Sequence, residues 1–187
     1  MTDIVQVLKR LSALFEEHGL EFAVMGGFAV RTYAIPRPTY DVDFTLAVDR
    51  PGLVKIFAAV KQLGLTVPEE YERGWTDKVG GMPVVKFRHY LQDRGIDIDV
   101  FLAENEFQRG LLARRRKEAV NGFSTWVVSA EDLILLKLLA NRPRDLLDVQ
   151  DVLFTQGQLD EQYLRKWADE LNVSDRLERA LAEQQGI

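Results

Sequence analysis

Four aspartates in two short apolar segments have the residue type and spacing that metal chemistry requires. Asp41 and Asp43 lie two positions apart in TYDVDFTLAV, and Asp97 and Asp99 lie two positions apart in IDIDVFLA. Side chains two apart on a strand point to one face, about 7 Å from each other, so each pair can direct its carboxylates at a cation. Magnesium prefers oxygen ligands and commonly keeps substrate phosphate oxygens in its shell. The first pair therefore predicts a magnesium site for a triphosphate, and a third carboxylate from the second pair would allow a second ion.

Two glycines precede the first acidic segment. Gly26 and Gly27 follow the apolar run Phe22–Met25, which is typical of a buried strand, and precede a predicted helix at Phe28–Ile35. Glycine lets the backbone approach a phosphate, and free N–H groups at a helix start favour an anion. Such a junction alone is more often just a tight turn. Its position before two acid-bearing strands favours a phosphate site.

The composition restricts the chemistry to oxygen-bound metals. The chain has no cysteine and only two histidines, which excludes disulfides, thiolate metal sites and a zinc cage. The net charge of -5 means that any nucleic-acid contact would need a local basic patch. No apolar run approaches the roughly 20 residues of a membrane span, and the N-terminus lacks a signal-peptide pattern. The expected compartment is the cytoplasm, with no membrane partner.

The elements that must position these residues follow from hydrophobic spacing. It predicts helices at 2–18, 28–35, 51–63, 106–116, 130–142, 145–154 and 161–183 and strands at 22–25, 39–48, 84–90, 96–102 and 123–128. Gln92 to Gly95 predict a hairpin connection, and residues 69–81 predict a surface loop. The strand-rich part ends near Ser129. We therefore expect an α/β (α+β) core over residues 1–128 and a helical C-terminal part over 129–187 packed against it.

The order of these segments resembles the signature of the nucleotidyltransferase superfamily of the polymerase-β type. The glycine pair is followed, after thirteen residues, by Asp41 within RPTYDVD, which has the form GG...RxTxDxD. The strand IDIDVFLA and the block EDLILLKLLANRPRDLLDVQDVL are similar to the minimal nucleotidyltransferases typified by AbiEii-like toxins of bacterial toxin–antitoxin and phage-defence systems. The resemblance covers about residues 20 to 155. It implies a nucleotidyltransferase-like mixed β-sheet flanked by helices.

The resemblance also implies roles for the matching residues. Gly26 and Gly27 would form the turn that contacts the triphosphate, and Asp41 and Asp43 would bind metal and serve catalysis. One departure is Phe28, which stands where the family more often has a serine or threonine. Phosphate contact at this turn would then rest on the backbone alone.

The third carboxylate has two candidates. The resemblance implies that Asp99 binds metal and activates the acceptor hydroxyl, because the family follows this acid with an apolar run, here Val100-Phe101-Leu102. Asp97 lies on the same strand face and stays open as the alternative.

Two cations are candidates for nucleotide binding. Lys137 lies in the apolar stripe of a predicted helix, where it either snorkels to the surface or, as in similar proteins, reaches the nucleotide phosphates. Arg37 either contacts a phosphate or forms an ion pair with Asp41 or Asp43.

Charged residues further along the chain have other expected roles. Arg144-Asp145 resembles a downstream basic and acidic pair of the family, whereas Asp148 and Asp151 are expected to face solvent. The most basic segment contains Arg109 and residues 114–117. It is either a solvated helix end or a patch that positions an RNA acceptor through its phosphates.

Together these patterns predict a Mg²⁺-dependent (or Mn²⁺-dependent) nucleotidyltransferase that moves a nucleoside monophosphate from an NTP such as ATP to a hydroxyl and releases pyrophosphate. The acceptor could be tRNA or another RNA, a protein, or a small molecule. The resemblance implies a toxin role and an antitoxin-like protein partner. The alternative is a catalytically weak nucleotide-binding or partner-binding module of the same fold. A metal phosphohydrolase is disfavoured because neither histidine lies near the acids in sequence.

Overall fold

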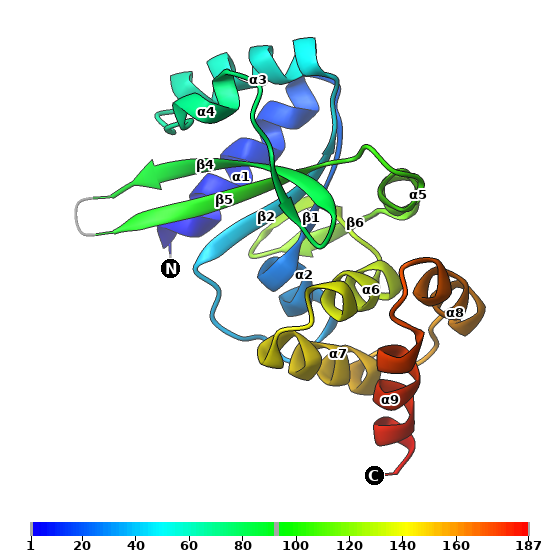
Figure 1. The fold of residues 1–187 in the computed structure, drawn as a ribbon. Coiled ribbons are helices and arrows are strands. Elements are labelled where there is room, and N and C mark those ends of the chain that lie inside the picture. The colour runs from blue at the N-terminus through cyan, green and yellow to red at the C-terminus, as the bar shows by residue number, and fades with distance from the viewer. Residues whose placement is uncertain (1, 92–93, 187) are drawn as a thin grey trace.

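The chain folds around one mixed β-sheet. The computed structural model describes residues 2–91 and 94–186. Seven strands among them form the sheet, in the order β3-β4-β5-β2-β1-β7-β6 (Figure 1). The strands are β1 (Glu21–Met25), β2 (Asp41–Ala47), β3 (Asp77–Val79), β4 (Met82–Tyr90), β5 (Gly95–Leu102), β6 (Arg116–Val120) and β7 (Phe123–Val127). The helices are α1 (Thr2–Glu17), α2 (Gly26–Tyr33), α3 (Arg50–Gln62), α4 (Glu69–Glu72), α5 (Glu106–Arg114), α6 (Ala130–Ala140), α7 (Pro143–Thr155), α8 (Glu161–Glu170) and α9 (Ser174–Gln185). The predicted α/β class is confirmed.

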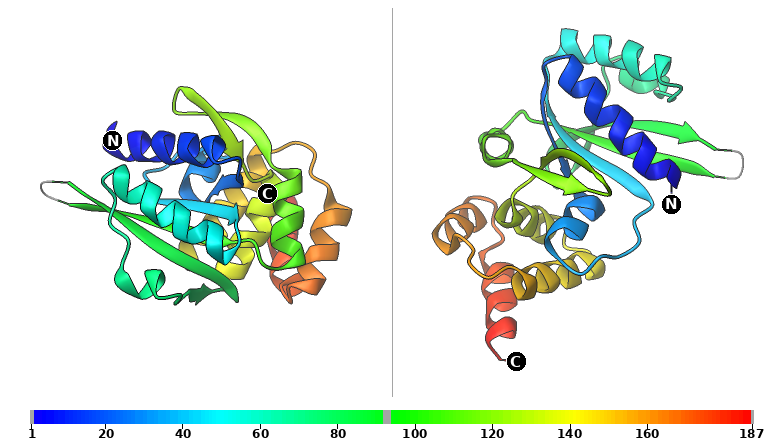
Figure 2. Two further views of the ribbon diagram at one scale, coloured as in Figure 1. Left: turned by 90° about the horizontal axis from the view of Figure 1, so that it is seen from above. Right: turned by 180° about the vertical axis from the view of Figure 1, so that it is seen from behind.

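Helices α1 and α3 cover one face of the sheet (Figures 1 and 2). The Phe15 ring of α1 lies 5.4 Å from that of Phe22 on β1 and 5.2 Å from that of Phe44 on β2. The Phe57 ring of α3 lies 6.0 Å from that of Phe87 on β4. Because side chains alternate along a strand, the neighbours of each aromatic residue on its own strand point to the opposite face of the sheet.

The opposite face carries the acids. Helix α2 packs on its central strands, α6 and α7 pack against α2, and α8 and α9 lie farther out (Figures 1 and 2). Strands β2 and β5 run parallel, and their register places Asp41 beside Asp97 and Asp43 beside Asp99. Strands distant in sequence thus bring the two predicted acid pairs together, as the proposed chemistry needs. No helix of the described residues is long and apolar enough to cross a membrane.

Several predicted elements differ from the structure. Residues 69–81 contain α4 and β3 instead of one loop, and the helix expected to reach Arg116 ends at Arg114, because β6 begins at Arg116. The single helix expected over 161–183 is two helices, since Asn172 adopts a left-handed backbone with φ 57°. Pro143 begins α7 at its first turn. In the predicted hairpin connection, Gln92 and Asp93 lie outside the described residues.

Candidate active site

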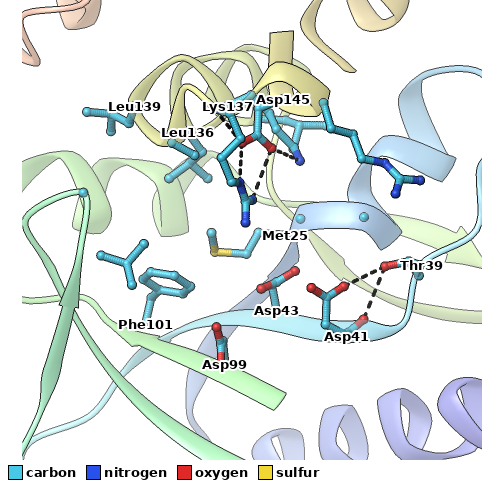
Figure 3. Close-up of a pocket in the computed structure, with 18 of the residues that line it drawn as sticks. Met25, Thr39, Asp41, Asp43, Asp99, Phe101, Leu136, Lys137, Leu139 and Asp145 are labelled. Carbon is cyan, nitrogen blue, oxygen red and sulfur yellow. Dashed lines mark hydrogen bonds and ion pairs between the residues drawn. The ribbon is translucent and has the colours of Figure 1, made fainter. Parts of the chain in front are cut away.

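Three of the four aspartates line one cavity. Asp41, Asp43 and Asp99 point into a space of about 450 Å³ between the sheet and helices α6 and α7 (Figure 3). Asp97 does not line this cavity. Its carboxylate is exposed and accepts a hydrogen bond from Arg88 Nε at 2.5 Å. The geometry therefore favours Asp99 as the third carboxylate, although its role stays a prediction.

The two glycines allow this approach of backbone and acid. Gly26 has φ +61°, and a Cβ at this position would overlap Asp43 Oδ2. A Cβ on Gly27 would overlap the hydroxyl oxygen of Thr39. A side chain at either position would thus displace a polar group of the cavity, and at Gly26 it would also strain the backbone.

Helix α2 begins at the glycine turn, two residues earlier than expected. Its N-cap residue, Met25, makes no side-chain capping hydrogen bond, and both glycines line the cavity. The first N–H groups of a helix lack partners within the helix and favour an anion. Phe28 is buried in the core, whereas Thr39 lies against Gly27 and donates its hydroxyl to Asp41 Oδ1 at 2.9 Å. The hydroxyl that lies beside the glycine turn thus belongs to Thr39, in the loop before β2, and it is bonded to Asp41.

The carboxylates repel one another. Burial, followed by the charges of Asp41 and Asp99, raises the pKa of Asp43 to about 7. Burial also raises the pKa of Asp99, while Lys86 Nζ, 3.8 Å away, opposes the shift. A cavity that concentrates negative charge in this way stabilises a bound cation.

The donor set fits magnesium or manganese only in part. Asp43 and Asp99 are neighbours on strands that lie about 4.8 Å apart, and both offer hard oxygen ligands. Within residues 2–91 and 94–186, however, no group of three or more acidic, histidine or cysteine side chains is arranged to hold a metal ion alone. Magnesium usually completes its shell with water and substrate phosphates. The residues present therefore fit an ion that arrives with a nucleotide.

A buried ion network lies above the carboxylates. Lys137 Nζ lies 2.8 Å from Asp145 and 2.7 Å from Asp148. Arg37 binds Asp148 through two nitrogens at 2.6 Å, and Arg142 Nε lies 2.6 Å from Asp145. Lys137 is buried, so the snorkelling interpretation is wrong. The expected pair between Arg37 and Asp41 or Asp43 is instead a pair with Asp148.

Asp148 corrects another expectation. It is 1% exposed, not solvent-facing, because α7 presents it to cations from α6 and from the loop before β2. Burial alone would raise the pKa of Asp148, but hydrogen bonds from Arg37 and Lys137 outweigh burial and lower it. Asp151, one turn later, is half-buried.

Arg144 has a different environment from these cations. It lines the cavity and donates a hydrogen bond to the carbonyl of Pro38 at 3.2 Å. In the described part of the chain, no carboxylate oxygen lies within 4.0 Å of its guanidinium. Because Lys137 and Arg37 are already paired, Arg144 is the cation in this cavity with the least compensated charge.

The basic segment lies away from the carboxylates. Arg114 bonds Glu131 at 3.2 Å and lies 3.8 Å from the Tyr163 ring centre, and Arg115 lies 4.8 Å from that of Trp126. Arg109 lies on α5 and donates a hydrogen bond to the carbonyl of Glu104 at 2.9 Å. Arg116 and Lys117 lie on β6, which is separated from β2 by β1 and β7. The structure thus does not bring this segment to the candidate site.

The sequence reasoning missed the apolar end of the cavity. Phe101, Leu136 and Leu139 line it opposite Thr39 (Figure 3), together with Met82 and Val79. The signal available was Phe101, which shares the strand face of Asp99. The helical contribution from α6 comes from residues far away in sequence, so only the fold reveals it.

Comparisons with known proteins agree with this geometry. Residues 6–184 match the family model described as "Nucleotidyl transferase AbiEii toxin, Type IV TA system". An antigenic nucleotidyltransferase-like protein from Paracoccidioides brasiliensis shares 20% identity and a TM-score of 0.55, over 95% of this chain and 91% of that chain. No curated protein matches the sequence.

An antibiotic-resistance factor and an antibiotic adenylyltransferase have the same fold. The antibiotic-resistance factor ANT(2'')-Ia gives a TM-score of 0.57 at 17% identity, over 99% of this chain and 97% of that chain. The lincosamide antibiotic adenylyltransferase LnuA gives a TM-score of 0.53 at 16% identity, over 80% of this chain and 96% of that chain. At these identities the likeness shows the fold.

Proposed function

Because the chain belongs to the AbiEii family and is therefore a nucleotidyltransferase, we propose that it transfers a nucleoside monophosphate from an NTP to an acceptor hydroxyl with Mg²⁺ or Mn²⁺. One observation carries this proposal. Asp41, Asp43 and Asp99 lie on adjoining parallel strands and share a cavity with the open N-terminus of α2.

The proposed transfer uses the three carboxylates in two ways, for proton acceptance and for binding of the divalent ion. Asp99 accepts the proton of the acceptor hydroxyl, whose oxygen then forms a bond to the α-phosphorus of the NTP. The bond from that phosphorus to the bridging oxygen of the β-phosphate breaks, and pyrophosphate leaves. A divalent ion that arrives with the NTP would be held by these carboxylates and the substrate together, and it would neutralise charge on the phosphates. In the metal-free protein, burial raises the pKa of Asp99, so this carboxylate holds a proton more tightly than an exposed aspartate does.

The phosphates have donors on the other side of the cavity. The backbone N–H groups of Gly26 and Gly27, at the start of α2, can donate hydrogen bonds to phosphate oxygens in the cavity. Arg144, which also lines the cavity, supplies a positive charge for the same phosphates. Lys137 and Arg37 are both paired with carboxylates of α7, so we propose that they hold α7 in place as well as bind nucleotide. The apolar end at Phe101 is suited to the nucleobase.

Binding experiments test the proposed site. Calorimetry with ATP, GTP, CTP and UTP should detect Mg²⁺-dependent binding to the wild-type protein. Asp43→Asn and Asp99→Asn should weaken that binding, whereas Asp97→Asn, two positions away on the same face, should not. NTP binding that is equally strong in all variants, or that does not need a divalent ion, would contradict the proposal.

We also propose that the chain is the toxin of a toxin–antitoxin pair with an antitoxin-like protein partner. The description of the matching family supports this role. Induced expression in a bacterium should arrest growth, and Asp43→Asn at equal protein level should not. Arrest by both proteins would separate toxicity from nucleotidyl transfer and sink this part of the proposal.

A further inference from the structure

Helix α7 exposes two large apolar side chains on the side of the helical layer that faces away from the sheet (Figures 1 and 2). Leu147 is 67% exposed and Phe154 is 75% exposed, although the same helix buries Val149 and Val152 in the core. Leu147 and Phe154 lie seven positions apart, which places them on one face of the helix, two turns from each other. The proposed catalysis makes no use of either side chain.

The apolar surface continues beside this helix, because the chain after α2 runs along α7. The Tyr33 carbonyl accepts a hydrogen bond from Gln156 at the end of the helix, at 2.7 Å. Arg37 pairs with Asp148 near its middle. Ile35 lies between these two points in the chain and is 58% exposed. Large apolar side chains that gather at one place on a surface mark a site of association, whereas scattered ones do not.

Two opposite charges lie on the same helix face. Arg144 and Asp151 alternate with Leu147 and Phe154 at spacings of three and four positions, and we call these four residues the α7 stripe. In the described part of the chain, no carboxylate oxygen lies within 4.0 Å of the Arg144 guanidinium, and no Lys, Arg or His nitrogen lies that close to the Asp151 carboxylate. Seven positions along a helix span about 10.5 Å, so the two groups do not pair with each other.

We propose that a second copy of this chain docks on the α7 stripe, with the two α7 helices antiparallel about a two-fold axis. When Leu147 meets its own copy at this axis, Arg144 of each copy lies opposite Asp151 of the other. Both charges then gain the partner that neither has within its own chain. A parallel arrangement would place like charges together. This self-complementary charge pattern identifies a second copy, and not an unrelated protein, as the occupant.

The contact also reaches the carboxylate cavity, because Arg144 lines it. This part of the inference rests on the proposed function, in which Arg144 supplies charge for the phosphates of the NTP. Asp151 of the second copy competes with those phosphates for the Arg144 guanidinium. Self-association and NTP binding therefore oppose each other by linkage, and the dimer is the form with the lower NTP affinity.

Sedimentation velocity of the full chain, without NTP or metal, tests the association. One helix pair with its flanking segment is a small interface, so we expect a dissociation constant on the order of 10⁻⁵ M. Leu147→Gln should weaken association at least tenfold, because both copies lose apolar contact at the axis. Leu146→Gln, at an exposed leucine on another face of the same helix, should match wild type. Wild-type protein that stays monomeric up to roughly 200 µM would overturn the inference and leave the stripe to a different partner.

Charge reversal tests the antiparallel register. Arg144→Asp should weaken association roughly tenfold, because aspartates would then face each other, and Asp151→Arg should do the same with arginines. The double variant Arg144→Asp/Asp151→Arg should return to within threefold of wild type, since each ion pair is reformed with its ends exchanged. A double variant that associates as weakly as the single variants would contradict this contact.

The same measurement with Mg²⁺ and an NTP tests the competition for Arg144. Saturating nucleotide should weaken association of the wild type about threefold or more. If calorimetry shows that the NTP binds and association is unchanged, the competition is wrong. If no NTP binds, the competition falls with the proposed function, while the leucine and charge-reversal variants still decide whether the second copy docks on α7. The two failures are therefore distinguishable.

Discussion

Asp43 is the residue at which stability and the proposed chemistry conflict. Burial and the charges of Asp41 and Asp99 raise its pKa from 3.8 to about 7 in the folded chain. The folded state therefore holds this proton more tightly than the unfolded state does. Ionisation of Asp43 lowers the stability of the metal-free protein, and the loss develops as the pH rises from 3.8 to about 7.

Removal of this charge should stabilise the metal-free protein. Asp43→Asn should raise the free energy of unfolding at pH 8 by on the order of 2 kcal/mol, with little effect at pH 4. Denaturant titrations in EDTA at both pH values measure this difference. Magnesium added together with an NTP should stabilise wild type at pH 8 and not the variant. A variant that is less stable than wild type at pH 8 would contradict the electrostatic account.

Asp97 and Asp99 form a matched pair for the catalytic assignment. Asp99→Asn should reduce transfer at least a hundredfold, because a general base contributes roughly 10²–10⁴ to the rate. Asp97→Asn should stay within threefold, since Asp97 lies outside the cavity and pairs with Arg88. Initial rates with saturating NTP compare them. The assignment is overturned if Asp97→Asn is the more damaging change.

The acid pairs could be identified from sequence because period-two alternation places each pair on one strand face. Their convergence could not, since the β2 and β5 register depends on the fold. The expectation that Asp148 faces solvent is wrong for a similar reason. Its partners, Arg37 and Lys137, come from other elements, and Arg37 is 111 positions away.

Among the elements, the turn into α2 depends most on a single residue type. Gly26→Ala should destabilise the protein by more than Gly19→Ala and should abolish NTP binding, because the new Cβ would overlap Asp43. Gly19 has a similar φ of +65°, but a Cβ there would meet no atom within 4 Å, so Gly19→Ala isolates the backbone strain of about 1–2 kcal/mol. Thermal unfolding and calorimetry compare the two. If both variants lost the same stability and the same NTP affinity, the close approach of Gly26 to Asp43 would be unimportant.

Helix α7 is held to the site through Asp148. Asp148→Asn should cost roughly 3 kcal/mol of unfolding free energy, because it leaves Arg37 with a neutral partner and buried Lys137 with Asp145 alone. Asp151→Asn, on the same helix but half-buried, should change it by about 0.5 kcal/mol or less. Urea titrations of both variants measure the difference. Similar stabilities would remove the structural role assigned to the network.

The elements that were not predicted from sequence have no informative hydrophobic periodicity. Strand β6 has the sequence RKEAV, which lacks alternating apolar residues, and it forms because β7 offers an antiparallel partner. Helix α4 and strand β3 are only four and three residues long, below the length at which periodicity is informative. The longer amphipathic helices could be predicted within a few residues, since one face of each is buried.

At the scale of the whole molecule, the helical part completes the cavity. Residues 1–128 supply the carboxylates and glycines, and residues 129–187 supply Lys137, Arg144 and the apolar wall from α6. The division at residue 128 stays a prediction about sequence organisation. The cavity needs residues from both sides of it, so neither part alone holds the proposed site.

Transfer of label from NTP tests the central claim most directly. Wild type with Mg²⁺ should transfer label from α-³²P NTP, but not from γ-³²P NTP, to RNA, protein or small molecules in a bacterial lysate. Asp43→Asn and wild type in EDTA should transfer neither. Transfer of the γ-label would indicate phosphoryl transfer instead. The account is contradicted by that outcome, by equal α-labelling with Asp43→Asn, or by the absence of labelling with all four NTPs.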